Sequence, residues 1–196
     1  MARHEIRIGG LGGQGVILCG MIIGRASALY DGKNATLIQA FGPEARGSAC
    51  SAQVVLSDEV IGYPYVKHPD ALLLLSQDAA AQFVPHLRAG GLVLYDSELL
   101  PTLPDLPPGA CAFGLPATRR AEALGRRLAA NVVMAGFFAG VTDWVSGPAL
   151  ERAVRDLLPR DSEELNLRAL RQGHECGRGL KRPESEAGRS GSFVTE

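Results

Sequence analysis

The sequence predicts an α/β domain of three layers, in which helices cover both faces of a mostly parallel, mixed central sheet. Residues 72–75 and 92–95 are short, wholly apolar runs, as is typical of central strands that are buried on both faces. Segments of helical length and period lie between and after these runs. Because strands that alternate with helices build parallel sheets, we expect a Rossmann-like α/β/α arrangement.

The first third of the chain predicts a strand, a glycine turn and a helix, followed by two further strands. Polar and apolar side chains alternate over residues 5–8, and a long apolar segment follows the glycines. Residues 57–59 predict a turn, after which the chain is expected to return as a hairpin. The expected elements are strand 5–8, a helix from the glycine turn to Tyr30, strands 35–40 and 49–56, and a hairpin return at Val60 and Ile61.

The rest of the chain predicts buried strands that alternate with helices and then an all-helical segment. Ser76 is a suitable helix N-cap, and Pro148 suits the first turn of a later helix. Residues 177–196 are rich in Gly, Ser, Arg and Glu, so we expect one domain over residues 1–176 and a disordered polar tail over 177–196. The expected elements are strands 72–75, 92–96 and 110–113, and helices 76–87, 119–128, 131–141, 148–157 and 162–171.

Composition and charge exclude several classes of protein. A net charge of -1 provides no basic field for a nucleic acid, and the apolar runs are too short to cross a membrane. No apolar signal region precedes the first strand, so we expect a cytoplasmic protein. The cysteines are far apart and form no C-x-x-C pair, so we expect no iron–sulfur cluster and no metal on this chain alone. They are Cys19, Cys50, Cys111 and Cys176.

A glycine-rich turn stands between the first strand and the first helix, where backbone N–H groups can hold a phosphate. The strand that follows ends without an acidic residue for a ribose, and the run lacks the lysine of a P-loop, so the sequence disfavours an NAD site and a Walker-type site. The glycines could bind an anion, or they could only allow a tight turn and close packing. The candidate cofactor-binding residues are Gly10, Gly12, Gly13, Gln14 and Gly15.

A second motif lies in the loop between strands 35–40 and 49–56. It displays a carboxylate and a guanidinium among turn-forming residues, which could orient an anionic ligand or pair across a subunit interface. The alternative is an exposed loop with a weak local ion pair. The candidate substrate or interface residues are Gly42, Pro43, Glu44, Arg46 and Gly47.

Several motifs in order resemble the gamma subunits of 2-oxoacid:ferredoxin (acceptor) oxidoreductases, and most closely those of the 2-oxoglutarate-type enzymes. The resemblance runs from Ile6 to beyond Asn131, and Phe41 and Ser48 stand where the family commonly has Tyr and Gly. It rests on I-G-G-L-G-G-Q-G-V, F-G-P-E-A-R-G-S-A-C-S-A-Q-V, I-G-Y-P-Y-V, P-D-A-L-L-L-L-S-Q, G-G-L-V-L-Y-D-S and N-V-V-M-A-G.

The resemblance implies a subunit of an enzyme that decarboxylates a 2-oxoacid oxidatively to an acyl-CoA. Thiamine diphosphate, Mg²⁺ and [4Fe-4S] clusters would lie on alpha, beta and delta subunits, with ferredoxin as electron acceptor. This chain would carry no catalytic residue and no complete active site, but would contribute to assembly and could contact coenzyme A. Pyruvate, branched-chain oxoacid and indolepyruvate enzymes, a stand-alone nucleotide- or CoA-binding domain, and a homodimer of the isolated chain remain open.

Overall fold

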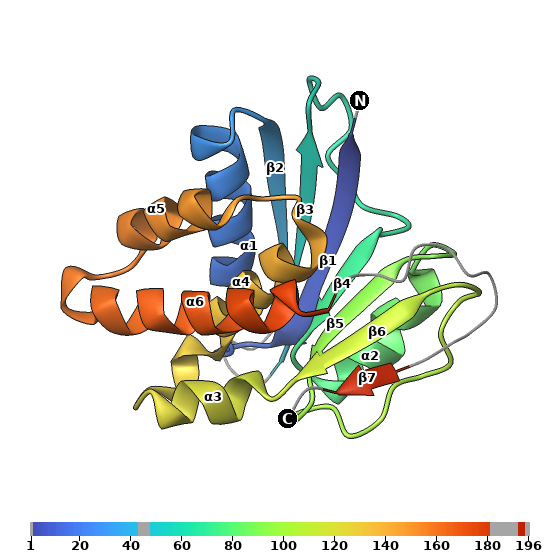
Figure 1. The fold of residues 1–196 in the computed structure, drawn as a ribbon. Coiled ribbons are helices and arrows are strands. Elements are labelled where there is room, and N and C mark those ends of the chain that lie inside the picture. Colours follow the sequence, from blue (N-terminus) through green and yellow to red (C-terminus); the bar gives the residue numbers. More distant parts are fainter. Residues whose placement is uncertain (1, 43–47, 181–191, 195–196) are drawn as a thin grey trace.

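The computed structural model describes residues 2–42, 48–180 and 192–194 of the 196-residue chain (Figure 1). Its strands are β1 (Arg3–Leu11), β2 (Asn34–Phe41), β3 (Ala49–Ser57), β4 (Ala71–Leu74), β5 (Leu92–Asp96), β6 (Cys111–Leu115) and β7 (Ser192–Val194). Its α-helices are α1 (Val16–Arg25), α2 (Gln77–Phe83), α3 (Ala117–Ala123), α4 (Ala130–Thr142), α5 (Gly147–Leu157) and α6 (Glu163–Arg178). A π-helical segment, η1 (Ala26–Tyr30), continues α1.

One mixed sheet of seven strands forms the centre of the domain, in the order β2-β3-β1-β4-β5-β6-β7. The five strands from β1 to β7 in this order are mutually parallel, whereas β3 is antiparallel to both β1 and β2. The prediction of a mostly parallel, mixed sheet is therefore confirmed. The antiparallel part arises because β2 and β3 form a hairpin after α1. Strand β3 of this hairpin lies between β2 and β1 in the sheet.

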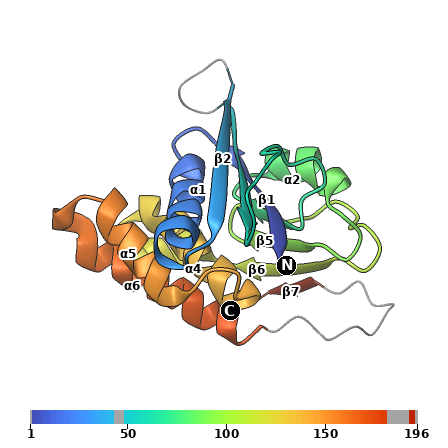
Figure 2. The same ribbon diagram turned by 90° about the horizontal axis from the view of Figure 1, so that it is seen from above.

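Helices cover both faces of this sheet, but unequally. Helices α1, α4, α5 and α6 lie on one side and α2 lies on the other (Figure 2). Alternate strand residues supply the two cores: Ile6, Ile8 and Leu73 face the larger helical layer, and Leu72 and Leu74 face α2. The three-layer prediction is confirmed, and the two buried cores explain why β4 and β5 are apolar at every position up to Asp96.

Helix α4 is the central helix of the thicker layer. Residues 131–140 are all buried, because the sheet, α1 and α6 surround the helix. The glycines of α4 and α6 permit an unusually close contact between the two helices. A Cβ atom on Gly136 would lie 2.0 Å from the carbonyl oxygen of Leu170, and one on Gly173 would lie 1.9 Å from that of Val133. Two further glycines one turn along, Gly140 and Gly177, repeat the arrangement.

Most predicted elements form close to the expected residues, and Ser76 caps α2 by accepting a hydrogen bond from the N–H of Ala79. The hairpin return at Val60 and Ile61 is wrong. Strand β3 already pairs with β2 on one side and β1 on the other, so no edge is left for a third strand. Val60 is instead 89% exposed in a loop.

The expected tail boundary falls within a helix. Helix α6 continues to Arg178, and Gly177 packs against α4, so these two residues belong to the folded domain. Residues 192–194 form β7, which pairs with β6, rather than the expected disorder. The rest of the expected tail, 181–191 and 195–196, lies outside the described residues.

Candidate functional site

The glycine turn lies at the carboxyl end of β1. At this end of the sheet, the connections that follow neighbouring parallel strands lead to helices on opposite faces. The connection after β1 leads to α1 on one face, and the connection after β4 leads to α2 on the other (Figure 2). A crevice between two such strands is the usual ligand position in open α/β sheets. The glycine turn therefore occupies the place where this fold class commonly binds ligands.

Gln14 fixes the turn to the neighbouring strand. Its side-chain oxygen accepts a hydrogen bond from the N–H of Leu11 at 2.6 Å, and its side-chain nitrogen donates to the carbonyl of Leu75 at 2.8 Å. Both polar ends of this candidate residue thus bind the protein backbone. The same amide lies 2.6 Å from the position of a Cβ on Gly10, so a side chain at residue 10 would displace it.

Two of the candidate glycines have positive φ angles, which L-residues with a side chain rarely adopt. Gly13 has a φ of 96° in open space, and Gly15 has a φ of 76° against the buried side chain of Asn131. A Cβ atom on Gly15 would lie 2.0 Å from the Asn131 amide nitrogen, which donates to the Gly15 carbonyl at 3.1 Å. The start of α4 therefore holds the start of α1 in place.

The two sequence motifs come together at this edge of the sheet. The N–H of Gly12 donates to the carbonyl of Ser48 at 2.9 Å, and the N–H of Gly42 donates to the carbonyl of Ala49 at 2.8 Å. Gly42 and Ser48 are the two ends of the second motif, so its loop begins and ends beside the glycine turn. Its other candidate residues, Pro43, Glu44, Arg46 and Gly47, lie outside the described residues.

A cavity of about 290 Å³ opens beside the turn. Gly12, Gly13 and Gln14 form one wall, and Thr118 and Arg127 bring a hydroxyl and a guanidinium from the segment after β6. Arg127 is exposed and its ion pair with Glu122, at 3.6 Å, is loose, so the guanidinium can turn toward an anion. Sequence reasoning missed Thr118 and Arg127, because no local motif links them to the glycines.

A buried carboxylate positions Thr118. Asp96, at the end of β5, accepts hydrogen bonds from the Thr118 hydroxyl at 2.6 Å, the Thr118 N–H at 2.9 Å and the Glu98 N–H at 3.0 Å. Burial raises the pKa of Asp96, and these bonds oppose that rise. Asp96 thus fixes the start of α3 along the wall of the cavity.

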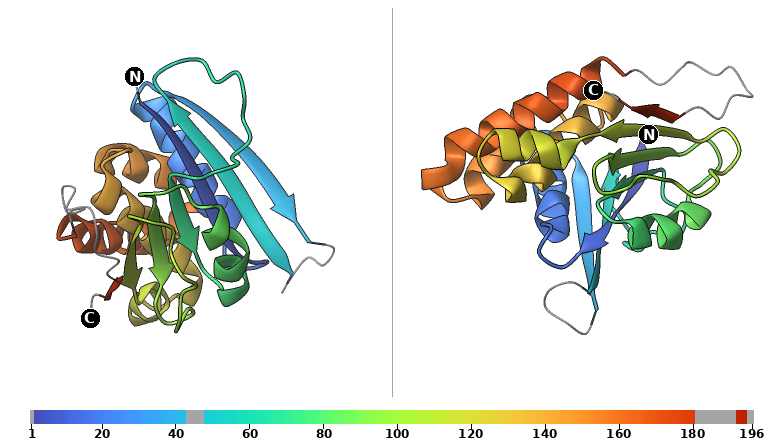
Figure 3. Two further views of the ribbon diagram at one scale, coloured as in Figure 1. Left: turned by 90° about the vertical axis from the view of Figure 1, so that its right-hand side faces the viewer. Right: turned by 90° about the horizontal axis from the view of Figure 1, so that it is seen from below.

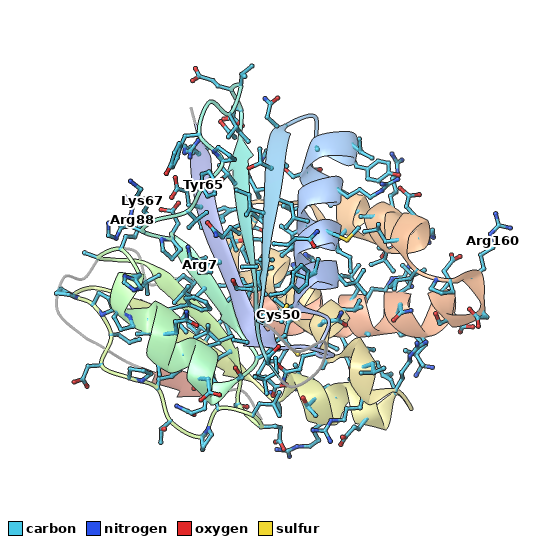
Figure 4. All side chains as sticks on the ribbon, turned by 180° about the vertical axis from the view of Figure 1, so that it is seen from behind. Arg7, Cys50, Tyr65, Lys67, Arg88 and Arg160 are labelled. Carbon is cyan, nitrogen blue, oxygen red and sulfur yellow. The ribbon has the colours of Figure 1, made fainter. Side chains whose placement is uncertain are left out.

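A second cavity, of about 330 Å³, is lined by Gly10 and Gly42 of the two motifs together with Arg7 and Gln53. A larger cavity of about 480 Å³ lies at the opposite edge of the sheet, beside His4 and Trp144, and none of the candidate residues lines it. Among residues 2–42, 48–180 and 192–194, no cluster of His, Cys, Asp or Glu could hold a metal ion. Burial raises the pKa of Cys19 to about 12, as expected for an unreactive thiol. Cys50 is also buried, at the glycine-turn end of β3 (Figure 4).

The fold differs from a dinucleotide-binding domain in the strand that would read a ribose. In that domain the strand after the first helix lies next to the first strand and is parallel to it. Here β2 pairs with β3 and lies at the edge of the sheet. The strand that carries the ribose-binding acid in that domain therefore has no counterpart beside β1. No helix among the described residues is long and apolar enough to cross a membrane.

Comparison with known proteins gives consistent matches along the chain. Residues 5–176 match the family model described as pyruvate ferredoxin/flavodoxin oxidoreductase. The chain is 43% identical over 181 residues to the 2-oxoglutarate synthase subunit KorC of Methanocaldococcus jannaschii, covering 91% of this chain and 96% of that protein. It is 33% identical to the pyruvate synthase subunit PorC of Methanothermobacter marburgensis, covering 87% and 96%.

A solved structure agrees with the fold. The gamma subunit of a keto/oxoacid ferredoxin oxidoreductase from Geobacter sulfurreducens superposes with a TM-score of 0.83 at 36% sequence identity. The alignment covers 93% of this chain and 100% of that subunit. Over the aligned residues, the fold described above is therefore also the fold of that gamma subunit.

Proposed function

The chain belongs to the pyruvate ferredoxin/flavodoxin oxidoreductase family, and from this premise we propose that it is the gamma subunit of a 2-oxoglutarate:ferredoxin oxidoreductase. The observation that carries the proposal is the 43% identity to a 2-oxoglutarate synthase subunit over nearly the full length of both chains. Identity to a pyruvate synthase subunit is lower, at 33%, so pyruvate is the second candidate substrate. The chain acts as part of an oxidoreductase and not as an enzyme alone.

The proposed reaction converts a 2-oxoacid and coenzyme A into CO₂, an acyl-CoA and one proton, with two electrons passing to two molecules of oxidised ferredoxin. Thiamine diphosphate with Mg²⁺ and the [4Fe-4S] clusters would be held by alpha, beta and delta subunits. The cysteines of this chain agree with this division. The four are separated along the chain, and two of them, Cys19 and Cys50, are buried as neutral thiols. The contribution of this chain is assembly and a contact for one substrate.

Coenzyme A is the substrate that suits the cavity at the glycine turn. Its diphosphate is an anion, and the N-terminus of a helix attracts anions through its dipole and its N–H groups. Gly12 and Gly13, in the turn that leads into α1, line this cavity, and Arg127, which also lines it, supplies a positive charge. We therefore assign the phosphates of coenzyme A to the space between Gly13 and Arg127.

The first test is assembly. Anaerobic purification of the tagged chain from its native cell is expected to recover thiamine-binding and cluster-binding subunits. The preparation should reduce a viologen dye in the presence of coenzyme A and 2-oxoglutarate, faster than with pyruvate, 2-oxoisovalerate or indolepyruvate. Recovery of an inactive chain without such subunits would refute the proposal and favour a stand-alone CoA-binding domain. Faster turnover with pyruvate would change only the substrate.

The second test concerns the coenzyme A contact and uses the assembled complex. Replacing Arg127 with Ala should raise the KM for coenzyme A about tenfold or more while the KM for the oxoacid stays constant, because a charge-assisted hydrogen bond contributes roughly 1.5–3 kcal/mol. Arg160→Ala is the matched control, since Arg160 points into solvent far from the turn (Figure 4). Equal coenzyme A KM values in both variants would reject the assigned contact.

A further inference from the structure

Arg7 carries a positive charge that no described carboxylate neutralises. Ile6 and Ile8 face the larger helical layer, so Arg7, which lies between them on β1, points to the opposite face of the sheet. None of the ion pairs among the described residues includes Arg7. One of its terminal nitrogens donates to the carbonyl of Val66 at 2.5 Å, and its Nε is buried with no hydrogen-bond partner among those residues. The guanidinium therefore keeps unused donors and no counter-charge.

The guanidinium of Arg7 is held in one position. The Phe83 ring of α2 lies against it, with the guanidinium carbon 5.0 Å from the ring centre, and the bond to Val66 fixes one of its ends. Burial lowers the pKa of Arg7, because the charged form loses contact with water. A buried donor without an acceptor costs free energy. A fixed guanidinium with an unused Nε is thus suited to an acceptor that comes from outside the chain.

The same guanidinium lines the cavity of about 330 Å³ described above. Gln53 and Ser51 of β3 line this cavity as well. The side-chain oxygen of Gln53 accepts a hydrogen bond from the N–H of Val66 at 2.8 Å, so its amide nitrogen remains available as a donor. Arg7, Gln53 and Ser51 thus bring a cation, an amide and a hydroxyl to one cavity.

This lining favours a single carboxylate over a phosphate. A carboxylate is planar, and its two oxygens can accept parallel hydrogen bonds from the Nε and a terminal nitrogen of one guanidinium. Asp78, which is exposed in the first turn of α2, is the one carboxylate among the described lining residues, and it makes no ion pair with Arg7. Its charge repels a doubly charged phosphate more strongly than a singly charged carboxylate.

The surroundings of the cavity resemble the surface of a protein interface. Helix α2 packs on β1 and β4, whereas β2 and β3 project beyond it (Figure 3), and no residue of β2 is buried. Phe41 lines the cavity with 67% of its surface exposed. Tyr63 and Tyr65 are half exposed, with ring centres 5.5 Å apart, and Tyr65 lies on the same side of β1 as Arg7 (Figure 4). A small ligand would leave these rings in water, whereas a docked protein surface would bury them.

We propose that this face docks a partner subunit of the oxidoreductase, and that an Asp or Glu side chain of that subunit enters the cavity and pairs with Arg7. The surrounding aromatic residues exclude water from the pair, which strengthens it. The segment I-G-Y-P-Y-V, residues 61–66, then has a role: Arg7 and Gln53 anchor its last residue, and its two tyrosines contact the partner. The inference rests on the chain being a subunit of such a complex and is independent of the oxoacid and of the coenzyme A contact.

The first test converts the proposed contact into a covalent bond. Arg7→Lys places a primary amine in the cavity of the assembled complex. A carbodiimide joins an amine to a carboxylate in contact with it as an amide, and takes up the released water to become a urea. Mass spectrometry should find residue 7 joined to an Asp or Glu of another subunit. Arg160→Lys, at a site that points into solvent, should give no such product with that subunit (Figure 4). No product at residue 7, or one with a carboxylate of this chain only, would overturn the proposal.

The second test measures how strongly the chain is held in the complex. Arg7→Met keeps the length of the side chain but removes its charge. Exchange against isotopically labelled parent chain should show that the variant leaves the complex about 30-fold faster or more. The melting temperature of the full chain alone should shift by no more than about 4 °C, because the lost bond to Val66 is offset by removal of an unpaired buried charge.

The other outcomes of this test are distinct. A parent-like exchange rate with a much lower melting temperature would reduce Arg7 to an internal anchor and overturn the proposal. A parent-like exchange rate with a raised KM for the oxoacid would replace the partner side chain with a free carboxylate, which also overturns it. In both cases the active complex is still recovered, so the proposed function stands. Failure to recover any partner subunit would refute both. If Arg7→Met does not fold, the crosslink of Arg7→Lys decides.

Discussion

The contact between α4 and α6 makes a quantitative prediction about Gly173. Replacing Gly173 with Ala would place a Cβ atom 1.9 Å from the carbonyl oxygen of Val133, whereas an ordinary contact of a Cβ atom begins at about 3.4 Å. The obstacle is helix backbone and cannot rotate away. The helices must separate, and they cannot do so without opening the reciprocal contact of Gly136 with the Leu170 carbonyl.

The magnitude follows from two opposing effects. Overpacking a close-packed interior costs roughly 1–3 kcal/mol, and an obstacle made of backbone on both helices belongs at or above the upper end of that range. Exchanging Gly for Ala within a helix returns about 1 kcal/mol through helix propensity. Gly173→Ala should therefore lower the free energy of unfolding by about 2 kcal/mol. In a domain of this size the melting temperature would fall by roughly 4–8 °C.

A glycine in another helix supplies the control. A Cβ atom on Gly24 of α1 would meet only Val54, at 3.9 Å, so Gly24→Ala should raise the free energy of unfolding by up to about 1 kcal/mol. Urea unfolding of the full chain, followed by circular dichroism, measures both variants. If Gly173→Ala is as stable as the parent chain, the close approach of the two helices does not exist as described.

Three further predictions concern the turn, the helical layer and a buried thiol. Gly15→Ala should lower the melting temperature, because it combines a positive φ with a clash against Asn131. Arg171 lowers the pKa of Glu151, so the pair stabilises the fold above the unfolded pKa of about 4.5. This stabilisation is lost as the pH falls through the lower pKa of the folded state. Arg171→Gln should therefore weaken the acid dependence of the melting temperature. Cys19, with a pKa of about 12, should resist alkylation at pH 8 until urea unfolds the chain, as mass spectrometry can determine.

The sequence predicted most elements because their signals are local. Continuous apolar runs identified β4 and β5, and the Ser76 N-cap identified the start of α2. The wrongly predicted hairpin at Val60 shows the limit of prediction from local sequence patterns. A turn followed by two apolar residues predicts a strand, yet pairing depends on which edges are free, and β3 has none. The end of α6 was also missed, since Gly177 weakens helix propensity but fits the close contact with α4.

The sequence predicted the turn between β1 and α1 correctly, but it gave no signal for the later residues that line the cavity beside this turn. The five glycine-turn candidates are consecutive or nearly so, and their order alone predicts a turn before a helix. Thr118 and Arg127 come from a segment about a hundred residues later. The two segments meet because β1, β4, β5 and β6 are parallel, so the carboxyl ends of these strands lie at the same end of the sheet.

The glycine turn is held by three separate elements, which bears on how an anion would bind there. Its bonds run from Gly12 to Ser48 before β3, from Gln14 to Leu75 after β4, and from Asn131 of α4 to Gly15. A turn with three such anchors cannot relax locally, so an anion would meet an ordered backbone and little ordering entropy is lost on binding, although the N–H groups of Gly12 and Gln14 already donate to Ser48 and Leu11. Substituting any of these glycines would therefore change stability and binding together. Arg127 carries only a loose ion pair at the surface, and its removal separates the two effects.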